Sequence, residues 1–360
     1  MRIVAAMNAA ATSVSTQSPL QQLLPEGLFD FWAGKLNPLW TLQRPLARLL
    51  AREPAGRGSA TLILRTNRHW RGLKAGQHVT LGVEIGGRRL LRSYSPTDLG
   101  GGRIAITVKA VEGGAVSQHL LETARIGEIF SIDQAFGEML LPAPSRPLLL
   151  LAAGSGITPM RALLRAATAR GQLQAPVELL YWVREREEFC FVEELQALAA
   201  AQPLLKVRLL ATGDAVQAPR IGDYPLEEIL ELAERQVFAC GPSGFVEAAR
   251  SRLQGQVVGF LAEAFSPPED LPGEDGEVEV HLARSGRTLR LPRNLSLLEG
   301  LEAQGLRPKH GCRMGICNTC ACSRQAGTTR NLANGERSDE PAVPVKLCVN
   351  APSTDLTLDL

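Results

Sequence analysis

The feature that most constrains this chain is a group of four cysteines near its C-terminus. Three of them follow the spacing C-x4-C-x2-C, and the fourth comes 28 positions after the third. They are Cys312, Cys317, Cys320 and Cys348. This spacing is typical of 2Fe–2S centres, in which one tight loop supplies three thiolates and a distant segment supplies the fourth. The sequence therefore predicts one 2Fe–2S cluster as a metal site of this protein.

Two other uses of these cysteines fit the pattern less well. A structural zinc site usually has two C-x2-C-like pairs, and only one is present here. A disulfide framework is typical of short secreted chains, whereas this chain has 360 residues and seven cysteines, an odd number. Free cysteines fit a reducing compartment, so we expect a cytoplasmic protein.

Length and composition are those of a globular protein of two or three domains, with 45% hydrophobic and 21% charged residues. A net charge of +2 gives no electrostatic reason to expect nucleic-acid binding. No apolar run reaches the roughly 18–20 residues of a membrane-spanning helix. Residues 1–22 lack the continuous apolar segment of a signal peptide, and Met7 is a second candidate for the initiator.

Changes in local pattern divide the chain into segments. Short strand-like runs between glycine turns predict an antiparallel β-barrel, and strands alternating with helices predict a doubly wound parallel sheet. A proline-, glycine- and acid-rich run marks a linker between domains. We predict an N-terminal extension (residues 1–56), a β-barrel (57–145), an α/β domain (146–265), a linker (266–276) and an α+β domain (277–360).

The end of the N-terminal extension, residues 27–50, is rich in apolar, aromatic and basic residues, including Trp32 and Trp40. Its prolines predict short helices, and residues 54–58 have the composition of a linker. Two interpretations stay open for the tryptophans. They could pack on the barrel, or they could contact a membrane surface in the manner of interfacial helices.

Two motifs in the predicted barrel suit a flavin nucleotide. At a strand end, Arg92 can pair with a phosphate, Tyr94 can lie on the isoalloxazine ring and Ser95 can hydrogen-bond near N5. About twenty residues later, glycines precede a helix start, where backbone amides favour an anion. The first motif alone could be a solvated strand end, and the second alone could be a glycine turn with a serine cap. This alternative explains the two motifs less well together, in this order within one predicted barrel. The second motif consists of Gly113, Gly114, Val116 and Ser117.

Two loops of the α/β domain follow predicted strands, where doubly wound folds bind their ligands. Glycines in the first loop allow close approach of a pyrophosphate, with Thr158 as the expected helix cap and Pro159 at the first helical position. A proline replaces the third glycine, so the strict dinucleotide-binding fingerprint fails. The alternative for the second loop is a buried cysteine before a turn. The loops contain Gly154, Gly156, Thr158 and Pro159, and Cys240, Gly241 and Pro242.

In this order, the motifs resemble those of the ferredoxin–NADP reductase superfamily, in the branch that ends in a plant-type ferredoxin domain of the β-grasp fold. The resemblance extends from about residue 57 to residue 360 and includes the reductases of phenylacetyl-CoA epoxidase and of fatty-acid desaturases. It implies that the barrel motifs bind FAD and that the α/β loops bind the nicotinamide nucleotide. FMN-containing dioxygenase reductases share the domain order, so FMN is the alternative.

The resemblance also implies catalytic roles. Ser95 would lie near flavin N5, Cys240 would face the nicotinamide, and Glu263 and Phe265 match positions near the flavin ring. For the nucleotide, Arg184 and Arg186 follow the second strand of the α/β domain, where a 2′-phosphate requires a cation. We therefore expect NADPH rather than NADH. Glutamates alternate with these arginines, and a solvated charged loop is the alternative.

These assignments predict an enzyme that takes two electrons from NADPH and passes them singly, through FAD and the 2Fe–2S cluster, to an acceptor protein. A terminal non-haem iron desaturase or oxygenase is the expected acceptor, with peripheral contact at the inner membrane surface through residues 27–50 as one interpretation. One alternative is the reductase of a soluble aromatic-ring or CoA-ester oxygenase that uses FMN and NADH. Another is a redox-sensing iron–sulfur regulator, which would not need the nucleotide-binding loops.

Overall fold

The computed structural model describes residues 32, 35–37, 39–143, 145–169, 171–213, 218–265, 274–315, 318–332, 335–340 and 343–360. The chain divides into two compact units, residues 1–44 and 45–360. Most of the first unit, residues 266–273 of the predicted linker and Cys317 lie outside the described residues. In the first unit the side chains of Trp32 and Trp40 are 64% and 54% exposed. None of the helices described is long and apolar enough to cross a membrane.

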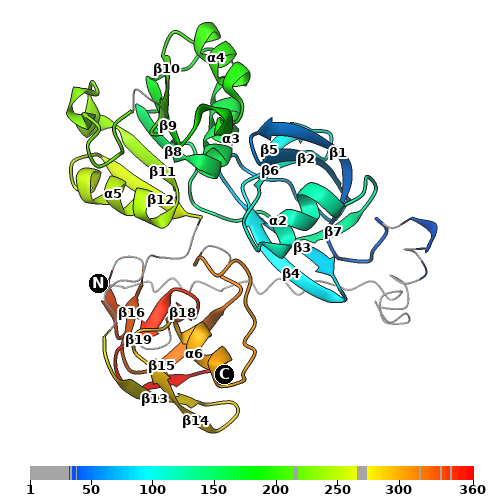
Figure 1. Cartoon of the computed structure of the whole chain (residues 1–360), viewed down its shortest axis with the longest axis vertical. Coiled ribbons are helices and arrows are strands. Elements are labelled where there is room, and N and C mark those ends of the chain that lie inside the picture. Colours follow the sequence, from blue (N-terminus) through cyan, green and yellow to red (C-terminus); the bar gives the residue numbers. More distant parts are fainter. Residues whose placement is uncertain are drawn as a thin grey trace, which may run out of the picture. The chain divides into compact units, whose positions relative to one another are not determined.

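The second unit begins with a seven-stranded antiparallel sheet that curls around its own core (Figure 1). The strands follow the order β4-β3-β7-β1-β2-β6-β5. A short helix, α2 (Ala115–Gln118), continues as one π-helical turn, η2 (His119–Thr123), and its buried Val116 and Leu120 join the core. The strands are β1 (Leu46–Gly56), β2 (Ser59–Thr66), β3 (Val79–Ile85), β4 (Arg88–Tyr94), β5 (Thr97–Gly100), β6 (Arg103–Lys109) and β7 (Ile129–Ile132).

Strand β1 corrects the prediction of short helices up to residue 50 and of a linker over residues 54–58. The strand pairs with both β2 and β7, so the barrel begins at Leu46 and not at residue 57. Its first half alternates buried Ala47 and Leu49 with exposed Arg48 and Leu50, which is the pattern of a strand with one face on a core. Pro54 is tolerated because this end of the strand leaves the core and its register is irregular.

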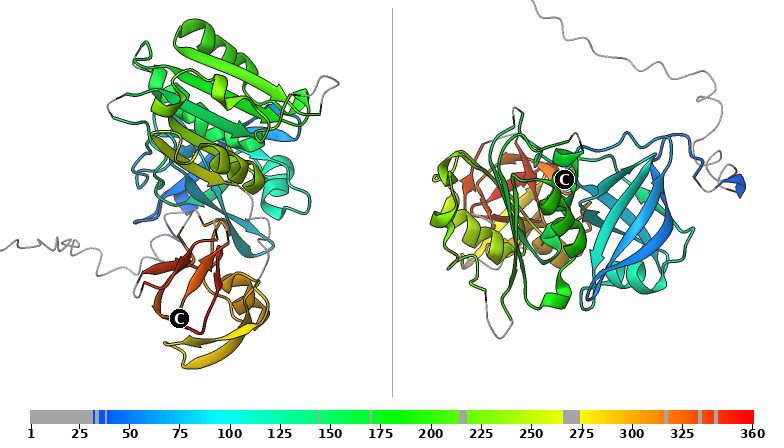
Figure 2. Two further views of the ribbon diagram at one scale, coloured as in Figure 1. Left: turned by 90° about the vertical axis from the view of Figure 1, so that its left-hand side faces the viewer. Right: turned by 90° about the horizontal axis from the view of Figure 1, so that it is seen from above.

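The α/β domain has the predicted doubly wound architecture. Its five parallel strands follow the order β10-β9-β8-β11-β12. Helices α3 and α4 cover one face of the sheet and α5 covers the other (Figure 2). One hydrophobic cluster therefore lies on each side of the sheet. The strands are β8 (Leu148–Ala153), β9 (Val177–Val183), β10 (Leu205–Ala211), β11 (Gln236–Gly241) and β12 (Gly259–Ala264), and the helices are α3 (Ile157–Thr168), α4 (Val192–Ala201) and α5 (Ser243–Leu253). Single turns of 3-10 helix lie at η3 (Gly154–Gly156), η4 (Arg186–Glu188), η5 (Leu226–Glu228) and η6 (Leu232–Glu234).

The C-terminal domain is an α+β unit with a mixed sheet in the order β14-β13-β20-β15-β18 and a smaller sheet in the order β17-β16-β19. Helix α6 (Leu297–Ala303) starts with a capping box, in which Ser296 and Glu299 satisfy each other's backbone amides. Arg324 is fully buried, and its guanidinium donates hydrogen bonds to Thr329 and Ser338. The strands are β13 (Glu277–Leu282), β14 (Arg287–Pro292), β15 (Ala321–Ala326), β16 (Thr329–Asn331), β17 (Arg337–Ser338), β18 (Pro344–Lys346), β19 (Asn350–Pro352) and β20 (Leu356–Leu358).

The place of β1 in the barrel core gives a test on two neighbouring residues. Leu49 is fully buried, whereas the side chain of Leu50 is 36% exposed. We expect Leu49→Ala to cost about 2–5 kcal/mol of barrel stability through the cavity that it leaves, and Leu50→Ala to cost much less. Thermal unfolding, with hydrogen exchange of peptides from β1 and β2, measures both. Equal effects of the two substitutions would contradict the strand assignment.

Candidate active site and cluster site

The carboxyl ends of β8, β11 and β12 carry most of the residues predicted to touch the nicotinamide. Cys240 and Glu263 are register partners on β11 and β12. The Cys240 thiol is fully buried and lies 3.6 Å from the Met139 sulfur. Burial, together with the nearby Glu263 carboxylate, raises the pKa of Cys240 well above its usual value, so the sulfur remains a thiol at neutral pH.

Gly156 lies against this end of the sheet. A Cβ atom at this position would lie 2.0 Å from the Cys240 carbonyl oxygen, so only glycine allows the approach. The turn before it uses Gly154 at φ +54°. The predicted cap is corrected: α3 begins at Ile157 with Gly156 as its N-cap, and Thr158 lies inside the first turn. Its hydroxyl donates to the Ser155 carbonyl at 3.0 Å, because a hydroxyl in a first turn can bond back to the backbone.

The predicted set at this edge is completed by four further residues, Pro159, Gly241, Pro242 and Phe265. Pro159 was expected at the first helical position, but it is the third residue of α3, because the helix already begins at Ile157. It is buried there, and Pro242 is the N-cap residue of α5. The Phe265 amide donates to the Gly241 carbonyl at 2.8 Å, and its ring packs on the core that includes Cys240. The fold therefore brings the two predicted loops and the end of β12 together at one edge of the sheet.

A histidine that the sequence analysis missed reaches the same edge from the barrel. The His78 Nε2 atom lies 3.1 Å from Glu263 Oε1, and His78 is only 3% exposed. The His78 backbone forms a bridge with Phe136, and the two rings meet edge to face. A titratable residue in the apolar run of a predicted strand was the signal that could have singled it out, but its partner is 185 positions away in the sequence.

The predicted flavin motif occupies the end of β4 and the turn after it. Arg92 is exposed, and its guanidinium donates to the neighbouring Leu91 carbonyl at 2.7 Å. Tyr94 packs on the barrel core, and this burial raises the pKa of its hydroxyl. Ser95 is buried directly after it. One exposed cation, one ring and one hydroxyl thus follow each other along a single edge of the barrel.

The second barrel motif forms a tight turn before α2. Gly113 has φ +68°, and a Cβ atom on Gly114 would lie 2.6 Å from the Ser117 hydroxyl. Ser117 is not the helix cap: Gly114 is, and the Ser117 hydroxyl donates to the Gly114 carbonyl at 2.9 Å and accepts from the Val111 amide at 3.2 Å. Ser117 therefore holds the turn closed from inside the helix. Its direct contact with a flavin phosphate stays a prediction.

Buried polar atoms without partners test whether these residues fit a flavin nucleotide. Among the described residues, the hydroxyls of Thr80 and Ser93 and the Oε2 atom of Glu263 are buried and have no hydrogen-bond partner. Thr80 and Ser93 are register partners on β3 and β4, beside the predicted flavin motif. Such atoms are costly to leave unpaired, so the position of these two hydroxyls beside the predicted flavin motif fits a site that a polar ligand completes.

The two arginines predicted for the 2′-phosphate lie in the exposed loop after β9. The Arg184 carbonyl accepts from the Gly213 amide at 2.7 Å, so this loop is joined to the one after β10. The glutamates among the arginines contact the barrel. Glu185 pairs with Arg57 at 2.5 Å, and Glu188 accepts from Lys109 at 2.9 Å. Binding of a 2′-phosphate by Arg184 and Arg186 stays a prediction.

Three of the four predicted cluster ligands are described, and each of them is buried in the C-terminal domain. The sulfurs of Cys320 and Cys348 are 3.2 Å apart, and Cys312 accepts from the Met314 amide at 3.4 Å. The neighbouring Cys320 thiol and burial raise the pKa of Cys348, so two thiolates at this spacing require a bound cation. In the part of the chain that is described, no three ligand-type side chains surround one point. Cys317, the fourth predicted ligand, is outside it.

The loop that carries Cys312 is braced by α6. Arg313 has φ +59°, an unusual value for a residue with a side chain, and its guanidinium makes two hydrogen bonds to Glu302 at 2.6 and 2.9 Å. Gly315 follows at φ +73°, and Lys346 donates to its carbonyl at 2.6 Å. These two contacts pin a strained loop next to the cysteines, as a preorganised metal site requires. The thiol set and the curled loop fit an iron–sulfur cluster.

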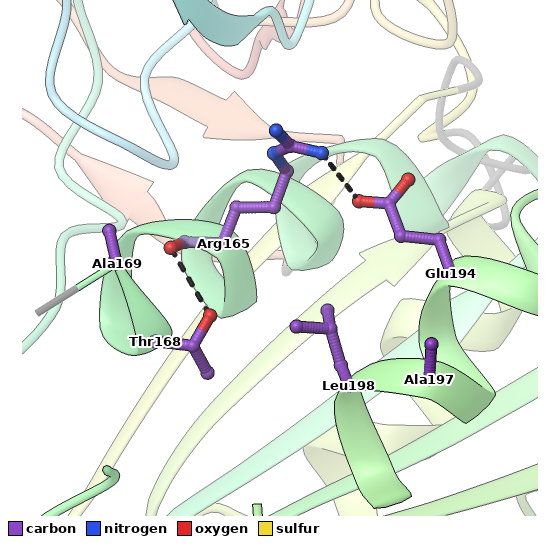
Figure 3. A pocket seen from close by; sticks show the side chains of 6 residues that line it. All are labelled: Arg165, Thr168, Ala169, Glu194, Ala197 and Leu198. Carbon is purple, nitrogen blue, oxygen red and sulfur yellow. Dashed lines mark hydrogen bonds and ion pairs between the residues drawn. The ribbon is translucent and has the colours of Figure 1, made fainter. Parts of the chain in front are cut away.

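One open pocket lies elsewhere, between α3 and α4 (Figure 3). Its volume is about 410 Å³, and in it Arg165 and Glu194 pair at 2.9 Å. None of the predicted site residues lines this pocket. It is lined by Arg165, Thr168, Ala169, Glu194, Ala197 and Leu198.

Three family models match the chain in the predicted order. They are described as an oxidoreductase FAD-binding domain (residues 48–140), an oxidoreductase NAD-binding domain (150–251) and a 2Fe-2S iron-sulfur cluster binding domain (280–352). An "NADPH oxidoreductase" of Mycobacterium tuberculosis is 34% identical over 92% of this chain and 88% of its own length. The chain belongs to the ferredoxin–NADP reductase superfamily, in the branch with a C-terminal 2Fe–2S domain.

Other relatives of this reductase are components of oxygenase systems. The ferredoxin reductase component of 3-ketosteroid-9-alpha-monooxygenase from Mycobacterium tuberculosis is 30% identical over 70% of this chain and 74% of its own length. Among solved structures, phthalate dioxygenase reductase matches with a TM-score of 0.60 at 24% identity, over 88% of this chain and 97% of that chain. The reductase therefore has the expected fold and is an oxidoreductase with FAD-binding, NAD-binding and 2Fe–2S domains.

The approach of Gly156 to Cys240 gives a second test. We expect Gly156→Ala to push the first loop away from β11 and to abolish reduction by NADPH, while dithionite still reduces the flavin and the cluster. Gly222→Ala is the matched control, because a Cβ atom there meets nothing within 4 Å. Stopped-flow absorbance under anaerobic conditions measures both variants. Normal reduction of Gly156→Ala by NADPH would show that the loop does not hold the nucleotide.

The His78–Glu263 pair gives a third test. We expect His78→Leu to slow NADPH-dependent flavin reduction by roughly ten- to a hundredfold, because it releases the end of β12 from the barrel and misplaces the reacting groups. His119→Leu is the control, because His119 pairs with Glu128 at 2.6 Å entirely within the barrel. Stopped-flow rates at saturating NADPH report flavin reduction separately from nucleotide binding. The same rate in both variants would argue against a role of His78 in positioning.

Proposed function

We propose that this protein is the NADPH-dependent reductase component of an oxygenase system and passes single electrons from its 2Fe–2S domain to a terminal oxygenase. The observation that supports this most is the joint presence of two sites in one chain. One is the edge of the sheet where Gly156, Cys240 and Glu263 meet the barrel histidine, and the other is the buried cysteine set of the C-terminal domain. An enzyme that only exchanged hydride would not need the second site.

The roles of the residues follow from their chemistry. Bound FAD would supply the chemistry that converts hydride transfer from the nicotinamide into transfer of single electrons. Arg92 would bind its phosphate, Tyr94 would contact the ring and Ser95 would hydrogen-bond near N5. Gly113, Gly114, Val116 and Ser117 would form the phosphate turn. Cys312, Cys317, Cys320 and Cys348 would hold the cluster.

At the sheet edge, each group has a distinct task. Gly154, Gly156 and Thr158 would hold the nucleotide, and the buried Cys240 thiol would close the nicotinamide pocket as an uncharged wall. Oxidation of one NADPH by two one-electron acceptors releases one proton. Glu263 Oε2 is buried without a partner among the described residues, and His78 holds the other carboxylate oxygen. We assign Glu263 as the acceptor of that proton and His78 as the residue that positions it.

The acceptor is proposed from the relatives. A glycine betaine monooxygenase reductase subunit of Pseudomonas aeruginosa, 27% identical over 79% of this chain, extends the group of oxygenase reductases. A terminal oxygenase is thus the best supported partner, and a desaturase stays a prediction, as does membrane contact through residues 27–50. The alternative of a redox sensor is not favoured, because a sensor has no use for the matched NAD-binding domain.

An anaerobic titration tests the relay. We expect NADPH to bleach the flavin absorbance and to produce the EPR signal of a reduced 2Fe–2S cluster, with NADH effective only at higher concentration. In a Cys320→Ser variant the flavin should still be reduced while the cluster signal is lost, because the two sites lie in separate domains. Should NADPH leave the cluster of the wild type oxidised while dithionite reduces it, the proposed relay is wrong.

A further inference from the structure

The loop between β9 and α4 has a charge that does not suit a phosphate by itself. Residues 184–188 contain two arginines and three glutamates, so their formal charge is −1. A 2′-phosphate requires a cation at this place, whereas an acidic residue there hydrogen-bonds the 2′-hydroxyl of NAD. The charge of this loop alone therefore does not decide between NADPH and NADH, and the residues that contact the glutamates have to be considered.

The barrel supplies two cations to this loop. Arg57 Nη2 lies 2.5 Å from Glu185 Oε2 and 3.8 Å from Glu188 Oε1, and Lys109 Nζ lies 2.9 Å from Glu188 Oε2. These cations come from the β1–β2 turn and from the end of β6. With both included, the formal charge of the cluster changes from −1 to +1.

The backbone fixes the same contact. The Arg57 amide donates to the Glu187 carbonyl at 2.7 Å. Gly56 lies so close to the loop that a Cβ atom would be 2.8 Å from the Phe189 carbonyl and 3.0 Å from the Glu188 carbonyl. The turn and the loop therefore meet through their main chains, and the ion pairs are held in place by this fit.

The pairing leaves one arginine for a ligand. Arg184 is exposed, and its side chain makes no hydrogen bond or ion pair with any of the described residues. Its backbone is held by the Gly213 amide at 2.7 Å, at the carboxyl edge of the sheet where doubly wound folds bind nucleotides. Arg184 is thus a positioned cation beside glutamates that are already neutralised.

We propose that Arg57 and Lys109 of the barrel determine the preference for NADPH. By holding Glu185 and Glu188, they keep these carboxylates away from the ribose and leave Arg184 to bind the 2′-phosphate. This inference rests on the proposed function, in which NADPH is the electron donor. It makes nucleotide choice a property of the contact between two domains and not of the nucleotide-binding domain alone.

Calorimetric titration of the oxidised holoenzyme with 2′,5′-ADP and with 5′-AMP tests the proposal without turnover. We expect the wild type to bind 2′,5′-ADP more tightly, and the double variant Arg57→Ala/Lys109→Ala to lose roughly three- to tenfold of that preference, the scale of a few screened charge contacts. Affinity for 5′-AMP should stay the same or increase. Arg103→Ala, an exposed cation at the other end of β6, should keep the wild-type ratio.

A rescue variant separates charge from structure. Adding Glu185→Gln and Glu188→Gln to the double variant removes the released carboxylates and should restore the preference for 2′,5′-ADP. A double variant that keeps the wild-type ratio, or a rescue variant that does not recover it, would overturn the inference. If the wild type itself shows no preference for 2′,5′-ADP, the proposed use of NADPH fails, which is a different outcome from failure of the barrel contact alone.

Discussion

The arrangement of this reductase depends on how closely the main chain can approach the carboxyl end of β11. Gly156 lies where a Cβ atom would overlap the Cys240 carbonyl, so the first loop and the central strand meet without a side chain between them. That contact places α3, the thiol of Cys240 and the carboxylate of Glu263 at one edge. The barrel then meets this edge through His78, Met139 and the β1–β2 turn.

Two kinds of contact join the barrel to the nucleotide-binding domain, and they differ in exposure. His78 and Cys240 are buried, so removing Glu263 or Met139 would leave a buried imidazole without its partner or a cavity beside the thiol, and both are costly. The pairs of Arg57 and Lys109 with the glutamates are more exposed and contribute less to stability. A weak, exposed contact can still decide which ligand binds, because it changes the charge that the ligand meets.

Much of the fold and of the site could be predicted from local patterns. The five strands and three helices of the α/β domain follow its apolar runs, and the glycine loops lie at the carboxyl edge as expected. Strand β1 could not be predicted in this way, because Pro45 and Pro54 flank its alternating residues and suggested breaks. The cap of α3 was predicted wrongly, because Gly156 and not Thr158 is its N-cap. Gly114 is the N-cap of α2, so the alternative of a cap at Ser117 does not hold either. In both cases the hydroxyl bonds back into its own turn.

The sequence by itself determined the chemistry that this chain can carry. The cysteine spacing and the glycine motifs can be recognised in short stretches of sequence, because cluster ligation and tight turns depend on residues that are close together in the chain. Only the tertiary structure decided which charges meet. Glu263 finds His78 across 185 positions, and Glu185 finds Arg57 across 128. Such pairs form only when two domains dock, since electrostatic contacts depend on distance in space and not along the chain.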